Sequence, residues 1–281
     1  IGFGLSSKVV GMKFYEGCTS LITGASAGLG AEFARQLAPH AHALILVARR
    51  LDRLEALRDE LQSAHRHLSV FIYGADLARE DQRQGLAAWL AAENLKVDFL
   101  VNNAGLGDRG EFATSDWPKV RAMLDVNIGA LTHLCHLLLP AMTAGGRAAI
   151  LNVSSVASFF PLPNMAVYSA TKAYVTSLSE ALAIELRPRG ITVTALCPGP
   201  VPTEFFTVAR RSDDEDAAAH YETLPAFVVS PQEAVRAGLE AVAHDRARVI
   251  PNPLLCLAVG AALVVPFFIT REILRAFRHK L

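Results

Sequence analysis

Short apolar runs alternate along this chain with longer segments in which apolar residues recur every three or four positions. The short runs predict strands at 19–24, 43–49, 69–76, 97–105, 148–155, 191–199 and 248–250. The longer segments predict helices near 28–38, 51–64, 79–92, 115–140, 166–188 and 231–244. Because parallel strands need long crossover connections, this alternation predicts an α/β fold with a parallel sheet covered by helices on both faces.

Three segments stand outside this alternation. Residues 1–16, which begin with Ile1 rather than methionine, are interpreted as a leader or a cloning remnant ahead of one domain over 17–250. Residues 200–230 hold several prolines and an acidic run at 213–216, and a loop of that length is more often functional than accidental. We expect this loop to close over a cleft as a lid. The third segment is the C-terminal part of the chain.

Residues 251–281 are expected to form an apolar C-terminal helix with a basic tail. Residues 254–269 carry no charge, and the following segment REILRAFRHK is basic. A membrane span needs about 20 apolar residues, whereas this run is shorter and Pro266 interrupts it. Three alternatives stay open: a helix packed on the lid or a partner subunit, peripheral membrane contact through 254–281, or a membrane anchor.

Composition narrows the function. The chain has 281 residues, 52% of them apolar, and its net charge is zero, which gives no indication of nucleic-acid binding. Four cysteines are scattered without zinc-binding spacing, which favours a reduced, cytoplasmic setting. His133 and His136 could share a helical face as metal ligands, but no nearby carboxylate or thiolate completes a set, so no metal is expected.

The turn after the first predicted strand reads TGASAGLG, residues 23–30. Its glycines, Gly24, Gly28 and Gly30, allow the backbone to approach a pyrophosphate, and the following helix offers free N–H groups at its N-terminus. A tight turn with no ligand is the alternative. The apolar strand before the turn and the amphipathic helix after it are the context that a dinucleotide site requires.

The end of the second predicted strand, VARR, bears on which nicotinamide cofactor fits. An acidic residue there usually binds the ribose 2′-hydroxyl of NAD, whereas this chain carries Arg49 and Arg50. Guanidinium groups pair well with a 2′-phosphate, so NADP(H) is favoured over NAD, with Arg49 as the first candidate and Arg50 as the second. The alternative is that both arginines only open the next helix in solvent.

The segment YSATK sets Tyr168 and Lys172 four residues apart. On a helix the two side chains lie on one face, about 6 Å apart at Cβ, and the ammonium group lowers the pKa of the phenol from its usual value of about 10. Such a phenol can exchange a proton near neutral pH. Because chance produces such a pair about one time in ten, the pair needs further residues beside it.

Those further residues match the pattern of a known family. The Gly-x-x-x-Gly-x-Gly spacing, the Tyr-x-x-x-Lys pair, NNAG at 102–105 and CPGPVPT at 197–203 together resemble the short-chain dehydrogenase/reductase family, in its NADP-preferring form, from about residue 17 to 250. The resemblance implies a single-domain, Rossmann-type doubly wound sheet of about seven strands. It also implies a homodimer or homotetramer that pairs through the long helices near 115–140 and 166–188.

The resemblance supplies a catalytic set of Asn127, Ser155, Tyr168 and Lys172. Tyr168 would act as general acid or base on a carbonyl or alcohol. Lys172 would assist it and hold the nicotinamide ribose, and Ser155 would bind the carbonyl oxygen. Asn127 would hold a water that links Lys172 to solvent.

The resemblance also assigns cofactor contacts to the glycine-rich turn, to the ends of four further strands and to the catalytic pair. The residues are Gly24, Ser26, Gly28, Leu29, Gly30, Arg49, Arg50, Asp76, Leu77, Asn103, Ala104, Gly105, Tyr168, Lys172, Pro198, Gly199, Val201 and Thr203. Among them, Asp76 is expected at the adenine ring, and Val201 and Thr203 at the carboxamide. Asn102 is expected beside the adenosine half of the site.

These residues imply an NADPH-dependent oxidoreductase that transfers a hydride between nicotinamide and a carbonyl or secondary alcohol. An apolar substrate is expected, because several apolar residues could line the pocket: Phe159, Phe160, Leu162, Met165, Phe205 and Phe206. The alternative is that about half of these residues only pack the core. One alternative is a cofactor-binding regulatory protein of the same fold without turnover. Another is a sugar-nucleotide epimerase or dehydratase, although little chain remains after the sixth strand for its substrate region.

Overall fold

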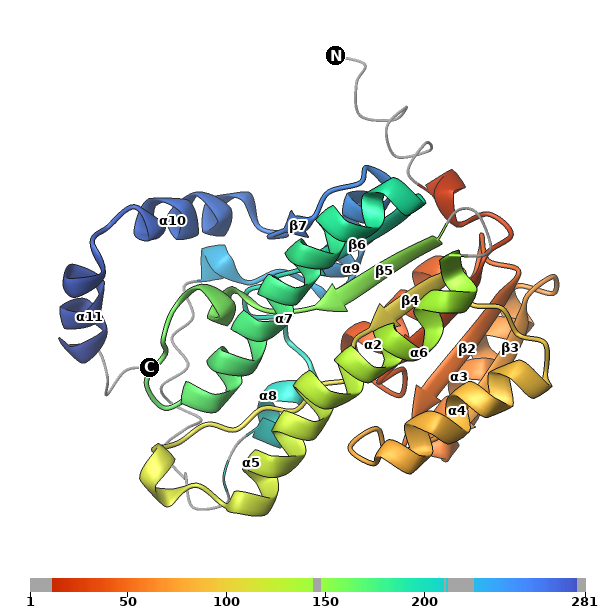
Figure 1. Ribbon diagram of the computed structural model, residues 1–281, viewed down its shortest axis with the longest axis horizontal. Coiled ribbons are helices and arrows are strands. Elements are labelled where there is room, and N and C mark those ends of the chain that lie inside the picture. Colours follow the sequence, from red (N-terminus) through yellow and green to blue (C-terminus); the bar gives the residue numbers. More distant parts are fainter. Residues whose placement is uncertain (1–11, 144–147, 210, 212–224, 277–281) are drawn as a thin grey trace, which may run out of the picture.

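The computed structural model describes residues 12–143, 148–209, 211 and 225–276 (Figure 1). Several features expected from the sequence lie outside the described residues: the leader up to residue 11, the acidic run at 213–216 and the end of the basic tail at 277–281. The side chain of Phe206 also lies outside the described part.

The described strands form one parallel sheet, as the alternation predicts. They are β1 Thr19–Thr23, β2 Ala43–Ala48, β3 Ser69–Gly74, β4 Phe99–Asn102, β5 Ala148–Val153, β6 Ile191–Leu196 and β7 Arg248–Val249. Their order across the sheet is β3-β2-β1-β4-β5-β6-β7, and every neighbouring pair is parallel. The chain winds in one direction from β1 and in the other from β4, which is the doubly wound Rossmann arrangement.

Helices cover both faces of the sheet. One face packs against α2 Gly28–Leu37, α3 Leu51–Ala64 and α9 Pro231–Ala243, and the other against α4 Glu80–Ala92, α6 Leu131–Thr143 and α7 Ala166–Leu186 (Figure 1). Successive residues of a strand point to opposite faces, so Ile22 of β1 joins the first core and Leu21 joins the second. All residues of β2 are buried, because a central parallel strand is covered on both sides.

Every strand ends one to three residues earlier than the sequence pattern predicts, and three of these ends shape the site. β3 ends at Gly74, β4 at Asn102 and β6 at Leu196. The residues that follow them include the polar Asp76 and Asn103 as well as small residues, and no single residue type marks where strand pairing stops. Residues 75–76, 103–105 and 198–199 leave the sheet at its carboxyl edge and line a pocket there.

The helix predicted near 115–140 is widened in its middle. α5 Trp117–Leu124 leads into a π-helical turn, Asp125–Ala130, and then into α6. Turns of this kind are rare and are frequently found at functional sites. Here the turn carries Asn127, one of the four catalytic candidates.

The segments after β6 and β7 contain short helices. The expected lid includes α8 Glu204–Ala209 and a 3₁₀ turn, Pro225–Phe227. The single C-terminal helix expected from the sequence is instead two helices, α10 Pro253–Leu263 and α11 Phe267–Ala276. The break falls before Pro266, because a proline lacks the N–H that continues a helix and its ring clashes with the preceding turn.

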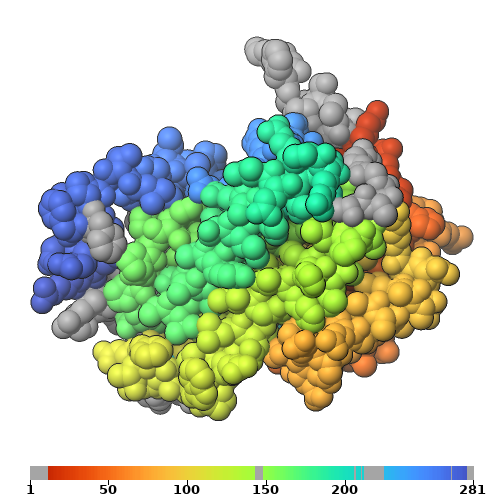
Figure 2. Space-filling view, viewed as in Figure 1, coloured from red at the N-terminus to blue at the C-terminus, as the bar shows by residue number. Residues whose placement is uncertain are grey.

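α10 packs on the body along one side only. Leu255 and Val259 are buried, and α10 contacts the 3₁₀ turns Val156–Phe159 and Pro225–Phe227, so it rests on part of the expected lid. Leu257, on the other side, is 73% exposed. Figure 2 shows this C-terminal segment, in blue, standing out from the body at the left edge of the view.

By length and composition, one described helix, Trp117–Met142, could cross a membrane, but its α6 part packs against the sheet as a core helix. α10 is apolar and has 11 residues. At 1.5 Å per residue it is about 16 Å long, which is too short to span a bilayer.

Candidate active site

A pocket of about 400 Å³ lies at the carboxyl edge of the sheet. Its walls come from the loops that follow β1 to β6 and from α7 and α8. The strand order reverses between β1 and β4, so the loops after these two strands run in opposite directions and leave a crevice. Ligands of doubly wound sheets bind in this crevice.

The glycine-rich turn between β1 and α2 forms one wall. Gly24 and Gly28 have φ angles of +66° and +55°, a region that side chains make unfavourable. A Cβ on Gly30 would fall on the carbonyl oxygen of Gly24. Among the described residues, no side chain caps the N-terminus of α2. The turn therefore offers a close backbone approach and unused N–H donors, as a pyrophosphate requires.

The end of β2 supplies the cationic side of the pocket. Arg49 and Arg50 line it, together with Asp76 and Leu77 after β3. Arg50 donates to Ser26 Oγ in the glycine-rich turn, from Nε at 3.3 Å and from Nη2 at 3.2 Å. Arg50 thus lies beside the turn where a phosphate would bind, and Arg49 lines the same pocket.

Arg50 has a second partner that the sequence pattern does not predict. Its Nη1 lies 3.1 Å from one carboxylate oxygen of Glu204, the first residue of α8, and Arg53 Nη1 lies 2.7 Å from the other oxygen. Arg53 follows Arg50 by about one helical turn, and Glu204 directly follows Thr203. Those spacings are the only signals in the sequence that could have drawn attention to Arg53 and Glu204.

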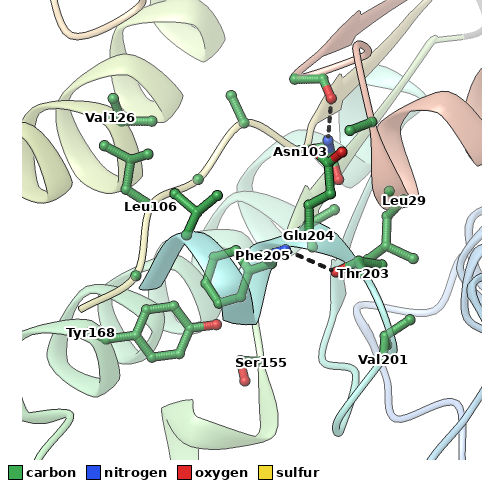
Figure 3. Close-up of a pocket in the computed structure, with 18 of the residues that line it drawn as sticks. Leu29, Asn103, Leu106, Val126, Ser155, Tyr168, Val201, Thr203, Glu204 and Phe205 are labelled. Atoms are coloured by element: carbon green, nitrogen blue, oxygen red, sulfur yellow. Dashed lines mark hydrogen bonds between the residues drawn. The ribbon is translucent and has the colours of Figure 1, made fainter. Parts of the chain in front are cut away.

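Tyr168 and Lys172 come together as their helical spacing predicts. Both line the pocket from α7, and Lys172 Nζ lies 5.7 Å from the centre of the Tyr168 ring. Lys172 is 5% exposed and donates to the carbonyl oxygen of Val153 at 2.8 Å. Burial lowers the pKa of the Lys172 ammonium to about 8, an effect that the neighbouring Cys197 partly opposes. In Figure 3 the Tyr168 hydroxyl points into the pocket on the side of Ser155.

Ser155 follows β5 and begins the 3₁₀ turn Val156–Phe159. Its Oγ accepts a hydrogen bond from the Ala157 N–H at 3.1 Å. A hydroxyl that accepts one bond keeps its own hydrogen to donate. Ser155 lines the pocket, so it can donate that hydrogen to an oxygen held beside Tyr168.

Asn127 lies behind the pocket wall. Its Oδ1 accepts from Leu106 N at 2.8 Å, and its Nδ2 donates to Leu106 O at 2.9 Å and to Thr171 Oγ1 at 3.0 Å. These bonds tie the π turn to the loop after β4 and to α7. Gly105 lies between Asn127 and Lys172, because a Cβ there would be 3.4 Å from Asn127 Oδ1 and 3.5 Å from Lys172 Nζ.

The NNAG segment divides between the core and the pocket. Asn103, Ala104 and Gly105 line the pocket, and Asn103 Nδ2 donates to Thr23 O at 2.9 Å. The expectation that Asn102 flanks the adenosine is wrong. Its side chain points into the core, where Nδ2 donates to Asn152 Oδ1 at 2.9 Å. Asn102 is the last residue of β4, so its side chain follows the alternation of the strand.

The pocket is apolar beside Tyr168. The lining residues that pack with Tyr168 are Leu106, Leu162, Met165 and Phe205. The ring of Phe205, from α8, lies 5.6 Å from the ring of Tyr168 (Figure 3). Phe159 and Phe160 are not among the lining residues, contrary to expectation. The 3₁₀ turn after Ser155 carries the Phe159 ring away, to a position 5.1 Å from the Arg248 guanidinium.

Most of the sequence-predicted site residues meet at this one pocket. Those that line it are Gly24, Ser26, Gly28, Leu29, Arg49, Arg50, Asp76, Leu77, Asn103, Ala104, Gly105, Ser155, Tyr168, Lys172, Pro198, Gly199, Val201 and Thr203. Gly30 and Asn127 support the wall from behind. His133, which shares a helical face with His136, accepts a hydrogen bond from Arg83 Nε at 3.0 Å.

The pocket fits a nicotinamide dinucleotide. The glycine-rich turn at the start of α2 suits a pyrophosphate, and the arginines after β2 suit a ribose phosphate. The buried Lys172 beside Tyr168 suits a ribose hydroxyl next to a reacting carbonyl. Fold and site together therefore define a dinucleotide-dependent enzyme.

The family follows from comparison with known proteins. A family model described as short chain dehydrogenase matches residues 19–214. The chain belongs to this family. A sulfoacetaldehyde reductase from Chromohalobacter salexigens is 38% identical over 202 residues, which are 70% of this chain and 77% of that protein. An NADP-dependent 3-hydroxy acid dehydrogenase from Salmonella typhi is 35% identical over 212 residues, 74% of this chain and 82% of that protein.

Solved structures agree with this assignment. A short-chain dehydrogenase from Sphingobium yanoikuyae in complex with NADPH matches with a TM-score of 0.76 and 34% identity, over 92% of this chain and 95% of that one. A short-chain dehydrogenase/reductase from Burkholderia phymatum in complex with NAD matches with a TM-score of 0.76 and 28% identity, over 87% and 92%. The protein is therefore an oxidoreductase with a nicotinamide cofactor, and it acts on the alcohol or carbonyl group of a small molecule.

Proposed function

We propose that this enzyme is an NADPH-dependent reductase or dehydrogenase that transfers a hydride between nicotinamide and the carbonyl or secondary alcohol of an apolar substrate. One observation carries the proposal. Tyr168, Lys172 and Ser155 line the same pocket as Arg49 and Arg50. A proton donor and a phosphate-binding group thus border one continuous space.

The preference for NADPH is supported by the chemistry at the end of β2. This strand ends at Ala48, and the next two residues are arginines, where an NAD site usually has an acid. A guanidinium group can pair with a phosphate through two parallel hydrogen bonds. Relatives do not decide the matter, because solved neighbours hold NADPH in one case and NAD in another.

The mechanism assigns a separate task to each catalytic side chain. When bound, the dinucleotide supplies or accepts the hydride. Tyr168 donates its phenolic proton to the carbonyl oxygen as negative charge develops there, and removes it again when an alcohol is oxidised. Lys172 stabilises the phenolate by its charge, and beyond its bond to Val153 it keeps two N–H donors for ribose hydroxyls. Ser155 donates to the same carbonyl oxygen and fixes its position.

Asn127 takes a supporting role in this mechanism. Its bonds to Leu106 and Thr171 hold the loop after β4 against α7. Gly105 leaves room between Asn127 and Lys172, where a water could link the ammonium group to solvent. Proton resupply to Tyr168 would follow this route.

An apolar substrate is supported by the side chains around Tyr168, such as Leu106, Met165 and Phe205. Among the described residues that line the pocket, the cations are Arg49, Arg50 and Lys172. All three are assigned to the cofactor. A negatively charged substrate, such as those named for the two relatives, therefore finds no further described cation beside Tyr168. Uncharged ketones and aldehydes fit this environment better.

The test is an assay of NADPH oxidation at 340 nm with a panel of apolar ketones and aldehydes. Tyr168→Phe should lower kcat by about 100-fold or more, because it removes the proton donor and keeps the ring. Tyr174→Phe is the matched control, since it makes the same change in α7 at a residue that is 38% exposed and bonded to Thr132. Turnover that survives Tyr168→Phe unchanged would refute the assignment of the acid.

A regulatory protein that binds the cofactor without turnover is the competing function. It predicts that NADPH binds, as measured by its fluorescence, while every carbonyl in the panel fails to oxidise it. The presence of Asn127, Ser155, Tyr168 and Lys172 together favours the enzyme.

We also propose a homodimer or homotetramer that assembles through the α5–α7 surface. Large apolar side chains are exposed there, with Trp117 63% and Ile184 77% accessible. A monomeric mass in light scattering at micromolar concentration would reject this assembly. Replacing Ile184 with Lys should dissociate it, because a charge would then have to be buried at the interface.

Peripheral membrane contact through 254–281 is supported, within its described part, by the exposed face of α10 and α11. Val264 is 82% and Phe268 66% exposed, and α11 carries Arg271 and Arg275. An exposed apolar face with basic residues beside it suits an anionic lipid surface. Co-sedimentation with anionic vesicles tests this contact, and a protein that stays in the supernatant contradicts it.

A further inference from the structure

Glu204, the first residue of α8, pairs with two arginines on the opposite side of the pocket. Glu204 Oε1 lies 2.7 Å from Arg53 Nη1, and Glu204 Oε2 lies 3.1 Å from Arg50 Nη1. Arg50 in turn donates to Ser26 of the glycine-rich turn. Ser26, Arg50 and Glu204 all line the pocket, so this bridge joins the segment after β6 to the end of β2 across it.

A second contact brings the same segment against the glycine-rich turn. A Cβ on Gly28 would lie 3.3 Å from Thr203 Cβ, which leaves little room between these two segments of the chain. A pyrophosphate at the N-terminus of α2 would pass beside this contact. Residues 203–204 therefore lie along the path that a dinucleotide would take, and the Glu204 carboxylate ties them there.

The Glu204 carboxylate accepts hydrogen bonds from guanidinium groups that an anionic ligand could otherwise use. Hydrogen bonds from Arg53, and then from Arg50, hold the pKa of the Glu204 carboxyl below its usual range. The group is therefore ionised at neutral pH. A phosphate can bind the same guanidinium donors and carries more negative charge than a carboxylate. A phosphate bound there would therefore be repelled by the Glu204 carboxylate.

We propose that Glu204 is a cofactor-selecting residue, whose carboxylate competes with the 2′-phosphate of NADPH for Arg50. The inference rests on the proposed function, since it requires NADPH to bind at this end of the pocket. When NADPH binds, the longer bond between Arg50 and Glu204 breaks and Arg50 pairs with the 2′-phosphate. The shorter bond between Arg53 and Glu204 remains. NADH has no 2′-phosphate to pair with Arg50, so the ion pair between Arg50 and Glu204 remains when NADH binds.

The ion pairs of Glu204 also bear on the part of the pocket near Tyr168, because Glu204 and Phe205 are neighbours in α8. Phe205 follows Glu204 directly and packs on Tyr168, with ring centres 5.6 Å apart. A change in the partners of Glu204 therefore acts on the first turn of the helix that covers the proton donor. The residue that would select the cofactor, Glu204, is therefore adjacent in the chain to Phe205, which packs on Tyr168.

The experiment separates this competition from catalysis by using cofactor fragments. Isothermal titration calorimetry at low ionic strength measures the Kd of 2′,5′-ADP and of 5′-AMP for the wild type and for Glu204→Gln. The two nucleotides differ by the 2′-phosphate alone, and neither carries nicotinamide. Glu204→Gln should bind 2′,5′-ADP about two- to fivefold more tightly, while its Kd for 5′-AMP changes by less than about 1.5-fold.

Two further variants serve as controls. Glu180→Gln removes the same charge from another exposed pair, in which Glu180 lies 2.9 Å from Arg248, and it should leave both dissociation constants unchanged. In an Arg50→Ala background, Glu204→Gln should no longer tighten 2′,5′-ADP binding, because the two anions have lost the donor for which they compete.

Each other outcome has a distinct meaning. A wild type that prefers 2′,5′-ADP but gains nothing from Glu204→Gln overturns the role of Glu204 and leaves the NADPH proposal standing. Weaker binding in Glu204→Gln also overturns the role, because the carboxylate would then organise Arg50 for the phosphate. A wild type that binds both nucleotides equally rejects NADPH preference itself, and the role of Glu204 with it.

Discussion

The ammonium group of Lys172 donates a hydrogen bond to the carbonyl oxygen of Val153, the last residue of β5, at 2.8 Å. The next residue, Ser154, makes the reverse link, because its hydroxyl donates to the backbone oxygen of Lys172 at 2.9 Å. The two bonds hold β5 and α7 together at the point where Ser155 and Tyr168 line the pocket. The partner of Lys172 is a neutral oxygen, so burial dominates and lowers the pKa of the ammonium to about 8.

This pKa predicts the pH dependence of the enzyme. Lys172 is cationic below about pH 8 and loses its charge above it, so kcat/KM for NADPH in the reductive direction should fall as pH rises through about 8. Lys172→Arg should move this limb to higher pH, because a guanidinium group does not titrate there. Lys96→Arg, at an exposed lysine, should leave the profile unchanged. A limb that stays near pH 8 in Lys172→Arg would contradict the assignment.

Asn127→Ala should lower the free energy of unfolding by about 1–3 kcal/mol, because the backbone N–H and C=O of Leu106 lose their partner. Urea unfolding measures this change. Thr171→Val is the comparison, since it removes the bond from Asn127 and the bond from Thr171 Oγ1 to the Tyr168 carbonyl oxygen, keeps both bonds to Leu106, and should cost less. An Asn127→Ala protein as stable as the wild type would show that water replaces the side chain without loss.

Gly30→Ala should destabilise the fold by about 1–3 kcal/mol and weaken cofactor binding, because the new methyl group would push the carbonyl oxygen of Gly24 out of place. Thermal unfolding with and without NADPH measures both effects. Gly260→Ala is the matched control. No described heavy atom lies within 4 Å of its added Cβ, and α10 should gain up to about 1 kcal/mol from the better helix former.

Arg49→Ala and Arg50→Ala should each weaken NADPH binding by about tenfold and leave NADH binding nearly unchanged, because each removes a charge-assisted hydrogen bond to the 2′-phosphate. Fluorescence titration gives both dissociation constants. Arg58→Ala, which removes an arginine of α3 outside the pocket that pairs with Asp59, should affect neither. Equal losses for NADPH and NADH would place the arginines elsewhere than at the 2′-phosphate.

The sequence predicts those parts of the site that depend on local spacing or on the sheet edge. Tyr168 and Lys172 meet because one helix holds them a turn apart. Gly24, Arg49 and Asp76 meet because each follows a strand of one parallel sheet, and the carboxyl ends of such strands share an edge. Neither inference needs long-range geometry.

The errors arise where the backbone path decides the direction of a side chain. Asn102 and Asn103 are chemically identical, and only the end of β4 sends one into the core and the other into the pocket. Phe159 turns away because of a 3₁₀ turn that no sequence pattern marks. The bond between Arg50 and Glu204 joins residues 154 positions apart, so it appears only once the chain is folded.

Leu255 of α10 abuts the turn after β6 so closely that a Cβ on Gly199 would lie 2.5 Å from Leu255 Cδ2. Gly199 lines the pocket, whereas α10 lies beyond residue 214, where the match to the family model ends. A helix near the edge of the fold thus packs directly behind a residue that lines the pocket. Tags, fusions or truncations that displace α10 should therefore alter the shape of the pocket through Leu255 and Gly199.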